Sequence, residues 1–306
     1  MKAASKTIAV LGALGGQGGS VVNSFLEDGS FKVRGVTRSV DSPASQALVS
    51  HGVEMVSGNA KEPTTLSRAF AGADVAFVVV NFWDPDILTK EGALTKAIFD
   101  EAKKAGIKHV IFSSLANVDK VSAGEITVPH FTLKAQAWEY LQTMGFDSVT
   151  AVEPAAYYSN WFTFFKPQEE DDGTLVWTWP GKKGNPFSQF DVSTGVGSAV
   201  LAAAKDPKKY HNQYILLEAE QISVEDIVDK ITTKMGKKGR VNFVDPKVFA
   251  TFFDGAEELA SMVKWFEDYG YYGPETDSRK HGSGKELGGL SSFQEWLDTE
   301  EYKKLL

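Results

Sequence analysis

The sequence predicts an α/β protein built on a doubly wound parallel sheet, with a smaller, mostly helical part towards the C-terminus. Short runs of β-branched residues alternate with helical patterns through the first half of the chain, as in successive βαβ units. The run Val75–Val80 is apolar at every position, which is typical of a central strand covered on both faces. A glycine-rich turn joins the first expected strand to the first expected helix. Together these features indicate a sheet with helices on both sides.

Strands and helices alternate strictly before Pro154. The expected strands are Thr7–Leu11, Lys32–Thr37, Val53–Ser57, Val75–Val80, His109–Ser113 and Ser148–Val152. The helices expected between them are Gln17–Glu27, Ser42–Ser50, Pro63–Phe70, Ile87–Ala105 and Pro129–Thr143. Because parallel neighbours need crossover connections of this length, the order favours one parallel sheet.

The composition changes after Pro154, where aromatic residues crowd the segment 157–165. We expect a two-stranded piece around Leu175–Trp179 that turns at Pro180-Gly181. Asp191 is a candidate N-cap for the next helix, and the run from Ser223 to Asp226 resembles a capping box. The later expected elements are a strand at Tyr210–Leu217 and helices at Asp191–Lys205, Ile227–Met235, Pro246–Tyr269 and Ser292–Tyr302.

Composition and charge narrow the classes of function. The 306 residues include 32 basic and 40 acidic side chains, so the net charge of −8 argues against direct nucleic-acid binding. Cysteine is absent, which excludes disulfides, thiolate nucleophiles and cysteine-ligated zinc, and the histidines show no metal-like spacing. No apolar run approaches the roughly 18 residues of a membrane-spanning helix. We expect a cytoplasmic protein, with the nucleus as an alternative for a regulatory role; the oligomeric state stays open.

The strongest motif is the glycine loop Gly12-Ala13-Leu14-Gly15-Gly16-Gln17-Gly18, which lies between an expected strand and an expected helix. The first glycine permits a tight turn, the second lets the backbone approach a pyrophosphate, and the third lets the helix pack closely on the strand. Phosphates would then meet the free N–H groups at the helix start. This context predicts a Rossmann-type dinucleotide site.

Arg38 indicates which dinucleotide is bound. NAD sites usually place a carboxylate at the end of the second strand, whereas this strand ends in Arg38 and the next carboxylate is Asp41. A guanidinium there suits a 2′-phosphate, so we expect NADP(H). The alternative is a solvated surface arginine. We therefore place residues 1–153, with about 187–218, in an NADP(H)-binding domain, and residues 154–186 and 219–306 in a smaller substrate or partner domain.

The sequence resembles the NmrA-like family, an atypical branch of the short-chain dehydrogenases/reductases, over nearly the whole chain. The residues that carry the resemblance are the glycine loop, Ser20, the runs 26–34 and 36–38, Asn81-Phe82-Trp83, the run 108–114, Pro129-His130-Phe131, Lys134 and the run 293–297. Membership implies the Rossmann-type fold. It does not decide the function, because the family mixes NADP(H) enzymes with non-catalytic redox sensors and transcriptional co-regulators.

The resemblance also implies further cofactor contacts. In the family pattern the glycine loop holds the pyrophosphate, Arg38 meets the 2′-phosphate and Lys134 bonds the nicotinamide ribose. The other positions implied are Asn59 near the adenine, Asn81 and Phe82 on the ribose side, Lys90, and Tyr157, Tyr158, Ser159 and Asn160 beside the nicotinamide.

The orthodox Tyr-x-x-x-Lys motif of these enzymes is altered, because His130 stands four residues before Lys134. Positions i and i+4 share one helical face, so both side chains can reach one site. His130 can donate or relay a proton near pH 7, and Lys134 can act as acid or base where desolvation lowers its pKa. Ser114, at the end of the fifth expected strand, is a weaker catalytic candidate. The alternative is that His130 only packs and Lys134 only anchors the ribose.

Aromatic residues follow the segment expected to border the nicotinamide. We expect a substrate pocket lined by Trp83, His130, Tyr157 and Trp161, beyond the carboxyl ends of the strands. The first interpretation is an NADP(H)-dependent oxidoreductase acting on a small, largely apolar carbonyl, imine or activated alkene. The second is a redox sensor that binds NADP(H) without turnover and acts through a regulatory protein partner. A third is an enzyme that holds the cofactor for non-redox chemistry.

Overall fold

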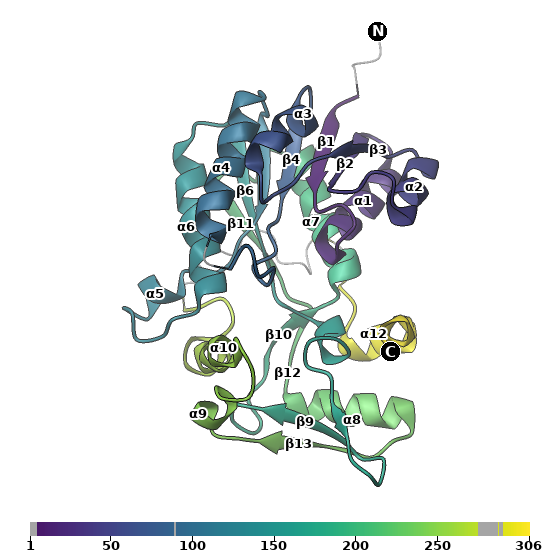
Figure 1. The fold of residues 1–306 in the computed structure, drawn as a ribbon, viewed down its shortest axis with the longest axis vertical. Helices are drawn as coiled ribbons and strands as arrows, with labels where there is room; N and C mark the ends of the chain where they lie inside the picture. The colour runs from purple at the N-terminus through teal and green to yellow at the C-terminus, as the bar shows by residue number, and fades with distance from the viewer. Residues whose placement is uncertain (1–4, 89, 275–286, 288–289) are drawn as a thin grey trace.

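The computed structural model describes residues 5–88, 90–274, 287 and 290–306. Figure 1 shows two parts, a larger one that contains the central sheet with its helices and adjoins the N-terminus, and a smaller one below it, with the C-terminus beside α12. Within the described residues, no helix is both long enough and apolar enough to span a lipid bilayer.

The larger part is a seven-stranded sheet in the order β11-β6-β5-β4-β1-β2-β3, with every pairing parallel. Its strands are β1 (Thr7–Leu11), β2 (Lys32–Thr37), β3 (Glu54–Ser57), β4 (Val75–Val78), β5 (His109–Ser113), β6 (Ser148–Pro154) and β11 (Gln213–Leu217). The strand order reverses between β1 and β4, which is the switch point at which doubly wound sheets bind ligands. The predicted doubly wound parallel sheet is confirmed.

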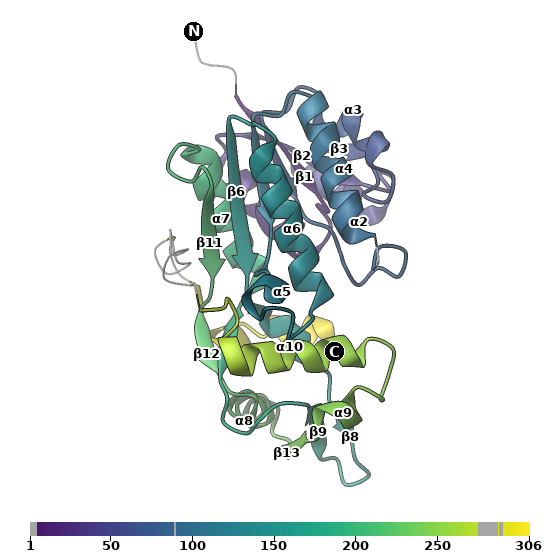
Figure 2. The ribbon, with the colours of Figure 1, turned by 90° about the vertical axis from the view of Figure 1, so that its left-hand side faces the viewer.

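Helices cover both faces of this sheet, as Figures 1 and 2 show. They are α1 (Gly16–Asp28), α2 (Pro43–Ser50), the 3-10 turn η1 (Pro63–Leu66), α3 (Ser67–Phe70), α4 (Glu91–Lys104), α5 (Val118–Val121), α6 (Pro129–Thr143) and α7 (Val192–Lys205). Along β1, Ile8 and Val10 enter the core shared with α1 and α7, whereas Ala9 and Leu11 enter the core beneath α3, α4 and α6. This alternation follows from the two-residue period of a strand.

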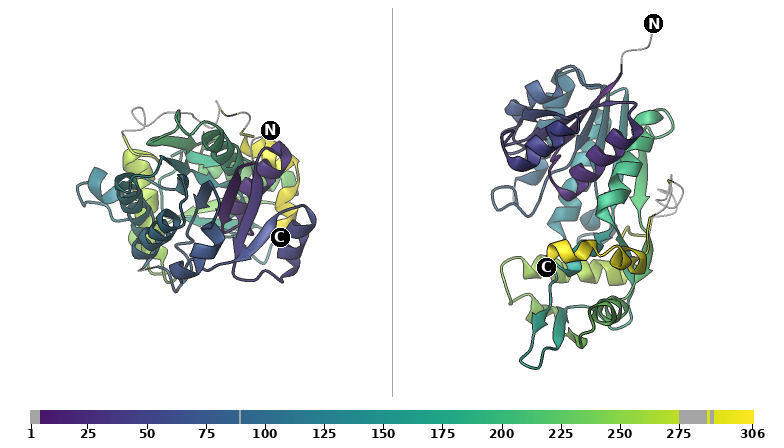
Figure 3. Two further views of the ribbon diagram at one scale, coloured as in Figure 1. Left: turned by 90° about the horizontal axis from the view of Figure 1, so that it is seen from above. Right: turned by 90° about the vertical axis from the view of Figure 1, so that its right-hand side faces the viewer.

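The smaller part contains two three-stranded sheets, β12-β10-β7 and β13-β9-β8. Its strands are β7 (Ala156–Tyr157), β8 (Gln168–Glu169), β9 (Leu175–Trp179), β10 (Phe187–Phe190), β12 (Glu220–Ile222) and β13 (Gly239–Phe243). Its helical segments are η2 (Tyr158–Trp161), α8 (Val224–Met235), α9 (Pro246–Phe249), α10 (Ala256–Tyr269), α12 (Phe293–Asp298) and η3 (Glu301–Leu305). Figure 3 shows α12 and the C-terminus lying at the level where the two parts meet.

Two local expectations differ from the structure. The expected turn at Pro180-Gly181 does not fold β9 back on itself; β9 pairs with β8 before it and, in parallel, with β13 far along the chain. The expected helix 246–269 is split, because α9 ends at Phe249 and α10 begins only after Gly255, whose φ is +93°. A side chain rarely adopts that backbone angle, so the glycine permits the sharp turn into α10.

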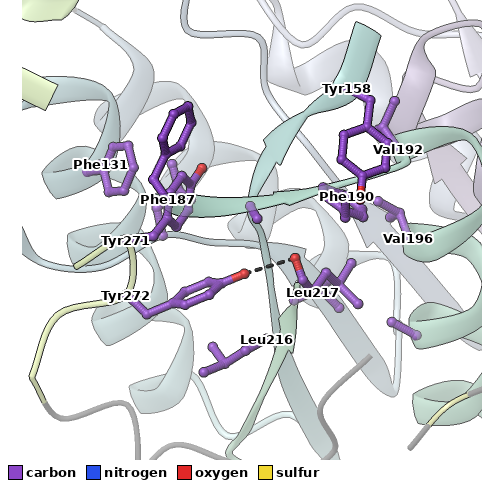
Figure 4. Close-up of a cluster of buried hydrophobic side chains, with 14 of the residues drawn as sticks. Phe131, Tyr158, Phe187, Phe190, Val192, Val196, Leu216, Leu217, Tyr271 and Tyr272 are labelled. Carbon is purple, nitrogen blue, oxygen red and sulfur yellow. Dashed lines mark hydrogen bonds between the residues drawn. The ribbon is translucent and has the colours of Figure 1, made fainter. Parts of the chain in front are cut away.

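The chain passes between the two parts three times, after β6, before α7 and after β11. Of the segment at about 187–218, which the sequence predicts in the NADP(H)-binding domain, α7 and β11 lie in the larger part, while β10 pairs with β7 and β12 of the smaller part. Figure 4 shows the buried side chains at this junction, where the Tyr272 hydroxyl donates a hydrogen bond of 2.9 Å to the Leu217 carbonyl. The two parts therefore share one continuous apolar core around the crossing segments.

Candidate functional site

The glycine loop forms a tight turn at the end of β1. Gly12 has a φ of +72°, and its carbonyl accepts a hydrogen bond of 2.9 Å from the Gly15 N–H. Gly15 is the N-cap of α1 and provides no side-chain cap. The N–H groups of the first helical turn have no partner within the helix, so they are available to an anion.

Gly18 is the position of this turn at which a side chain does not fit. A Cβ on Gly18 would overlap the backbone carbonyl of Gly12, whereas a Cβ on Gly16 would meet Val192 at the start of α7 at an ordinary 3.6 Å. The close approach of α1 to the strand turn therefore requires glycine at position 18. Gln17, beside it, donates a hydrogen bond of 2.6 Å to the Tyr157 hydroxyl.

A cavity of about 880 Å³ opens at the carboxyl ends of the central strands, between the two parts of the molecule. Its volume is within the range of about 300–1,000 Å³ typical of cofactor and ligand sites. The expected site residues that line it are Gly12, Leu14, Gly15, Gly16, Gln17, Gly18, Arg38, Asn59, Asn81, Phe82, Trp83, His130, Lys134, Tyr157, Ser159 and Asn160. The structure therefore brings most of the expected positions to one place.

Five expected site residues lie outside that lining and have other surroundings. Ala13 is buried behind the loop, and Lys90 is an exposed residue at the start of α4. Ser114 is fully buried, with its hydroxyl directed to the Leu115 carbonyl. Tyr158 donates to the Ser291 carbonyl at 3.1 Å, and Trp161 donates from its indole N–H to Gln189 at 2.7 Å. The last two are core residues of the smaller part.

Charged side chains surround the end of the cavity near β2 and β3. Arg38 is exposed there and forms no ion pair with any residue that the structure describes. Lys61 pairs with Asp84 at 2.8 Å and with Asp86 at 2.7 Å. The hydrogen bond from Lys61 and the more distant charge of Arg38 lower the pKa of the Asp84 carboxyl. Because Lys61 compensates Asp84, the Arg38 guanidinium remains available for an anionic ligand.

Lys134 projects from α6 into the middle of the cavity. Its Nζ donates to the Val80 carbonyl at 2.9 Å and forms a buried ion pair with Glu91 at the start of α4. Burial raises the pKa of the Glu91 carboxyl above its ordinary value, and Lys134 opposes that shift. An ammonium has three donors, so two are used within the protein and one remains.

His130 lies one helical turn before Lys134 on the same face of α6. Its Nδ1 is 2.5 Å from Oε1 of Glu258, a residue of α10, and the same oxygen accepts the His130 backbone N–H at 2.9 Å. The ring is enclosed by Phe82, Trp83 and Phe131, with centroid distances of 5.5, 5.3 and 4.8 Å. The imidazole is therefore held in a largely apolar wall of the cavity.

Aromatic and apolar side chains form the remaining wall. They are Phe164, Phe165, Trp179, Phe187, Leu259, Met262, Phe266 and Tyr271. Stacked pairs within it, such as Trp179 with Phe187 and Phe187 with Phe266, keep the wall rigid. Burial raises the pKa of the Tyr157 hydroxyl to about 12, with the bond from Gln17 opposing, so Tyr157 stays protonated at neutral pH.

The sequence did not point to Glu91 or Glu258, the two carboxylates that engage the α6 side chains. Glu91 is 43 residues from Lys134 and Glu258 is 128 residues from His130. Each lies in the first turn of its helix, where acidic residues are common for reasons of the helix dipole alone. No local pattern therefore distinguishes these two from other glutamates.

The strand order β3-β2-β1-β4-β5-β6, the glycine loop after β1 and the cavity at the switch point define a Rossmann-type α/β protein. The model of the NmrA-like family matches residues 4–302, and the chain belongs to that family. The resemblance seen in the sequence is confirmed.

Named relatives include oxidoreductases and a regulator. The NmrA-like family domain-containing oxidoreductase FrzB of Cladobotryum sp. is 31% identical over 277 residues, which cover 85% of this chain and 82% of the relative. NmrA, a negative transcriptional regulator solved in complex with NAD, has a TM-score of 0.81 at 25% identity and covers 99% of this chain and 98% of its own. The NADP complex of NmrA has a TM-score of 0.80 at 24% identity, with the same coverage.

Proposed function

We propose that this protein is an NADP(H)-dependent oxidoreductase. It would move hydride between the nicotinamide and a small, largely apolar carbonyl, imine or activated alkene. The observation that carries the proposal is one continuous cavity, which joins the glycine loop and Arg38 at one end to an aromatic wall at the other, with Lys134 and His130 between them. The oxidoreductase FrzB and the NAD and NADP complexes of NmrA support a nicotinamide cofactor.

The residues at the loop fit a dinucleotide. Gly18 lets α1 pack closely on the Gly12 turn, and the backbone N–H groups at the start of α1 receive no side-chain cap, so they can meet a pyrophosphate. Oε1 of Gln17 is buried and has no hydrogen-bond partner among the described residues, which leaves it free to accept from a ligand. Arg38 would hold the 2′-phosphate of NADP(H) and stack on the adenine. These features favour NADP(H), with the choice against NAD(H) resting on Arg38.

Lys134 and His130 would take the two other roles near the reacting centre, which are to hold the nicotinamide ribose and to exchange a proton with the substrate. The third donor of the Lys134 ammonium would hold the nicotinamide ribose, while Glu91 and the Val80 carbonyl fix its position. When bound, the cofactor would supply or accept the hydride at C4 of the nicotinamide. His130 lies in the same wall and would give or take the proton at the substrate oxygen or nitrogen. Lys134 would assist through its charge.

The aromatic wall supports an apolar substrate. Apart from His130 and Lys134, the described residues on that side of the cavity are predominantly aromatic or aliphatic. An apolar molecule there would bury its surface against rings, whereas a charged group would be left without a counter-ion. The polar atom that reacts would face His130. The substrate class therefore follows from one apolar wall with one proton-handling group.

Deuterium transfer tests the proposal directly. NADPH deuterated at C4, on either face in separate samples, is incubated with the protein and a mixed panel of ketones, imines and enones. Mass spectrometry of the products then shows whether the label moves. Labelled product, absent when the protein is omitted, would establish hydride transfer. Unlabelled new product would indicate non-redox chemistry on a retained cofactor.

A redox sensor is the second candidate, favoured by the replacement of the orthodox tyrosine by His130. In that case the protein would bind NADP(H) without turnover and report through a regulatory protein partner. NADPH binding in the same sample, with no label in any product, would move the assignment to the sensor. The same cavity would serve both functions, so only turnover separates them.

A further inference from the structure

Glu258 is the one carboxylate of the described chain that contacts the proposed proton-handling side chain. We propose that Glu258 is a positioning residue, which holds the His130 ring with Nδ1 protonated and leaves Nε2 to exchange the proton with the substrate. The inference rests on the proposed function, because the proton exchange with the substrate belongs to the proposed oxidoreductase reaction. It adds a residue of α10, in the smaller part, to a site otherwise built on the central sheet.

The direction of the bond follows from a shared oxygen. Oε1 of Glu258 accepts the backbone N–H of His130 at 2.9 Å, so this oxygen acts as an acceptor. As a carboxylate, Glu258 has no hydrogen to donate, so we assign the hydrogen of the contact with the ring, 2.5 Å long, to Nδ1. Nε2 makes no hydrogen bond within the described residues. Nδ1 is therefore held by Glu258, and Nε2 is available to the substrate.

The same contact caps α6. The N-cap residue of this helix, Val128, has no side-chain oxygen to offer, and Pro129 occupies the first helical position. Glu258 supplies the missing acceptor from another helix by bonding the N–H of the next residue, His130. Backbone and ring of His130 are thus held by one carboxylate oxygen, and the ring cannot turn without breaking that bond.

The carboxylate also fits the proton balance of a reduction. Hydride adds to the substrate carbon while the carbonyl oxygen takes the proton from Nε2 of a cationic imidazole, giving an alcohol and neutral His130. Glu258 stabilises the cation before transfer and keeps the remaining proton on Nδ1 afterwards. Water then returns the proton to Nε2. In the oxidation direction the same steps run in reverse.

The placement of α10 connects the smaller part to the chemistry. Figure 2 shows α10 lying across the lower end of α6, and Gly255 begins that helix beside Trp83. Glu258 and His130 are both largely buried at this contact, which strengthens a charge-assisted hydrogen bond. Displacing α10 would separate the pair, so the proton-transfer group is complete only when the two parts are in contact.

The test combines kinetics with ring spectroscopy. Glu258→Gln keeps an acceptor but removes the charge, and Glu258→Met removes both at similar length. We expect kcat for label transfer to fall about 10-fold in the first and about 100-fold in the second, the range measured for carboxylates that orient metal-ligating histidines. KM and the Kd of NADPH should stay within about twofold. Glu257→Gln and Glu257→Met, on the exposed neighbouring residue, should leave all three unchanged.

Nitrogen-15 NMR of the histidine rings reads the positioning without turnover. His130, assigned by comparison with His130→Gln, should keep Nδ1 protonated across the pH range in the wild type and lose that state in Glu258→Met. Wild-type His130 with its neutral proton on Nε2, or an unchanged kcat in Glu258→Met, would overturn the proposal. If the methionine variant does not fold, the wild-type spectrum and Glu258→Gln decide. Absence of label transfer by the wild type would instead overturn the proposed function, whatever the ring spectrum shows.

Discussion

The two ends of the cavity are built in different ways. The phosphate end is made by backbone within the seven-residue run Gly12–Gly18, and its geometry follows from where glycine occurs. The reacting end is made by side chains that meet across long stretches of chain, with a sequence separation of 128 residues from His130 to Glu258. A backbone site depends on a few local angles, whereas a side-chain site depends on the packing of whole helices. The two ends should therefore fail differently when altered.

The largest effect is expected from breaking the buried pair at the reacting end. Lys134→Met leaves the Glu91 carboxylate buried without its counter-ion, which costs about 3–5 kcal/mol of the free energy of unfolding. Unfolding in urea, followed by circular dichroism, measures it. Glu91→Gln combined with Lys134→Met removes both charges and should recover most of the loss. Equal destabilisation by the single and double changes would contradict this account.

The same variant should show a defined pH dependence. Burial raises the pKa of Glu91 above its ordinary value of 4.5, so between pH 4.5 and the raised pKa the folded state holds a proton that the unfolded state has released. Stability then falls as the pH rises from 4.5 to the raised pKa. Loss of Lys134 removes the interaction that opposes this shift, so the pKa of Glu91 rises further. The pH range over which stability falls then becomes wider. The destabilisation of Lys134→Met should therefore be larger at pH 8 than at pH 5, and the double variant should lack the difference.

The second effect concerns the phosphate end. Gly18→Ala places a Cβ against the Gly12 carbonyl, and the turn must move. We expect a loss of about 1–3 kcal/mol in stability from overpacking, and a fall of about 100-fold in NADPH affinity because the helix start shifts. Thermal unfolding and fluorescence titration measure the two quantities. Gly19→Ala is the matched control, since its Cβ would meet its nearest neighbour, the Ala13 carbonyl, at an ordinary 3.8 Å.

The same contrast explains what the sequence predicts. The alternation of strands and helices and the glycine loop are local patterns, and the sheet and the phosphate end of the cavity follow from them. His130 and Lys134 share a helical face by their spacing alone. Their partners Glu258 and Glu91 come from other helices, and no spacing rule connects them. The sequence therefore indicates which side chains face the site, and packing decides what holds them.

The aromatic run after Pro154 shows what the sequence does not predict. Trp161 and Tyr158 belong to the same aromatic run as Tyr157, and sequence alone does not separate them. In the structure Tyr157 lines the cavity, whereas Tyr158 and Trp161 turn into the core and bond to Ser291 and Gln189. Trp161 is held by β10, and Tyr158 by Ser291 and the rings of α12, all of which come later in the chain. The aromatic composition of the segment predicts a wall of rings, but only the fold shows which of these rings line the cavity.

A third, smaller effect separates the two dinucleotides. Arg38→Ala should weaken NADPH binding by about 10- to 100-fold and leave NADH binding nearly unchanged, because only NADPH carries the 2′-phosphate. Titration of both dinucleotides against wild type and variant measures it. Arg34→Ala, within β2 four residues before Arg38 but bonded to Glu54 and to the backbone of α3, is the control for loss of a cation. Equal losses for NADPH and NADH would show that Arg38 does not read the phosphate.

The smallest effect is expected at the aromatic wall. Phe164 is 46% exposed and contacts Trp83 and Phe165 at the edge of the cavity, with centroid distances of 5.3 and 5.0 Å. Phe164→Ala removes one ring that would contact the substrate, and such a contact contributes about 0.5–1.5 kcal/mol. KM for apolar substrates should therefore rise about 3- to 10-fold, while NADPH affinity stays constant. Phe252→Ala is matched in exposure, at 49%, but lies outside the cavity lining, and it should change neither quantity. A rise in KM from both variants would place substrate contacts on the outer surface rather than in the wall. A rise from Phe164→Ala alone would show that the aromatic wall, unlike the glycine loop or the Lys134–Glu91 pair, tolerates the loss of a single side chain, because many rings share the contact with the substrate.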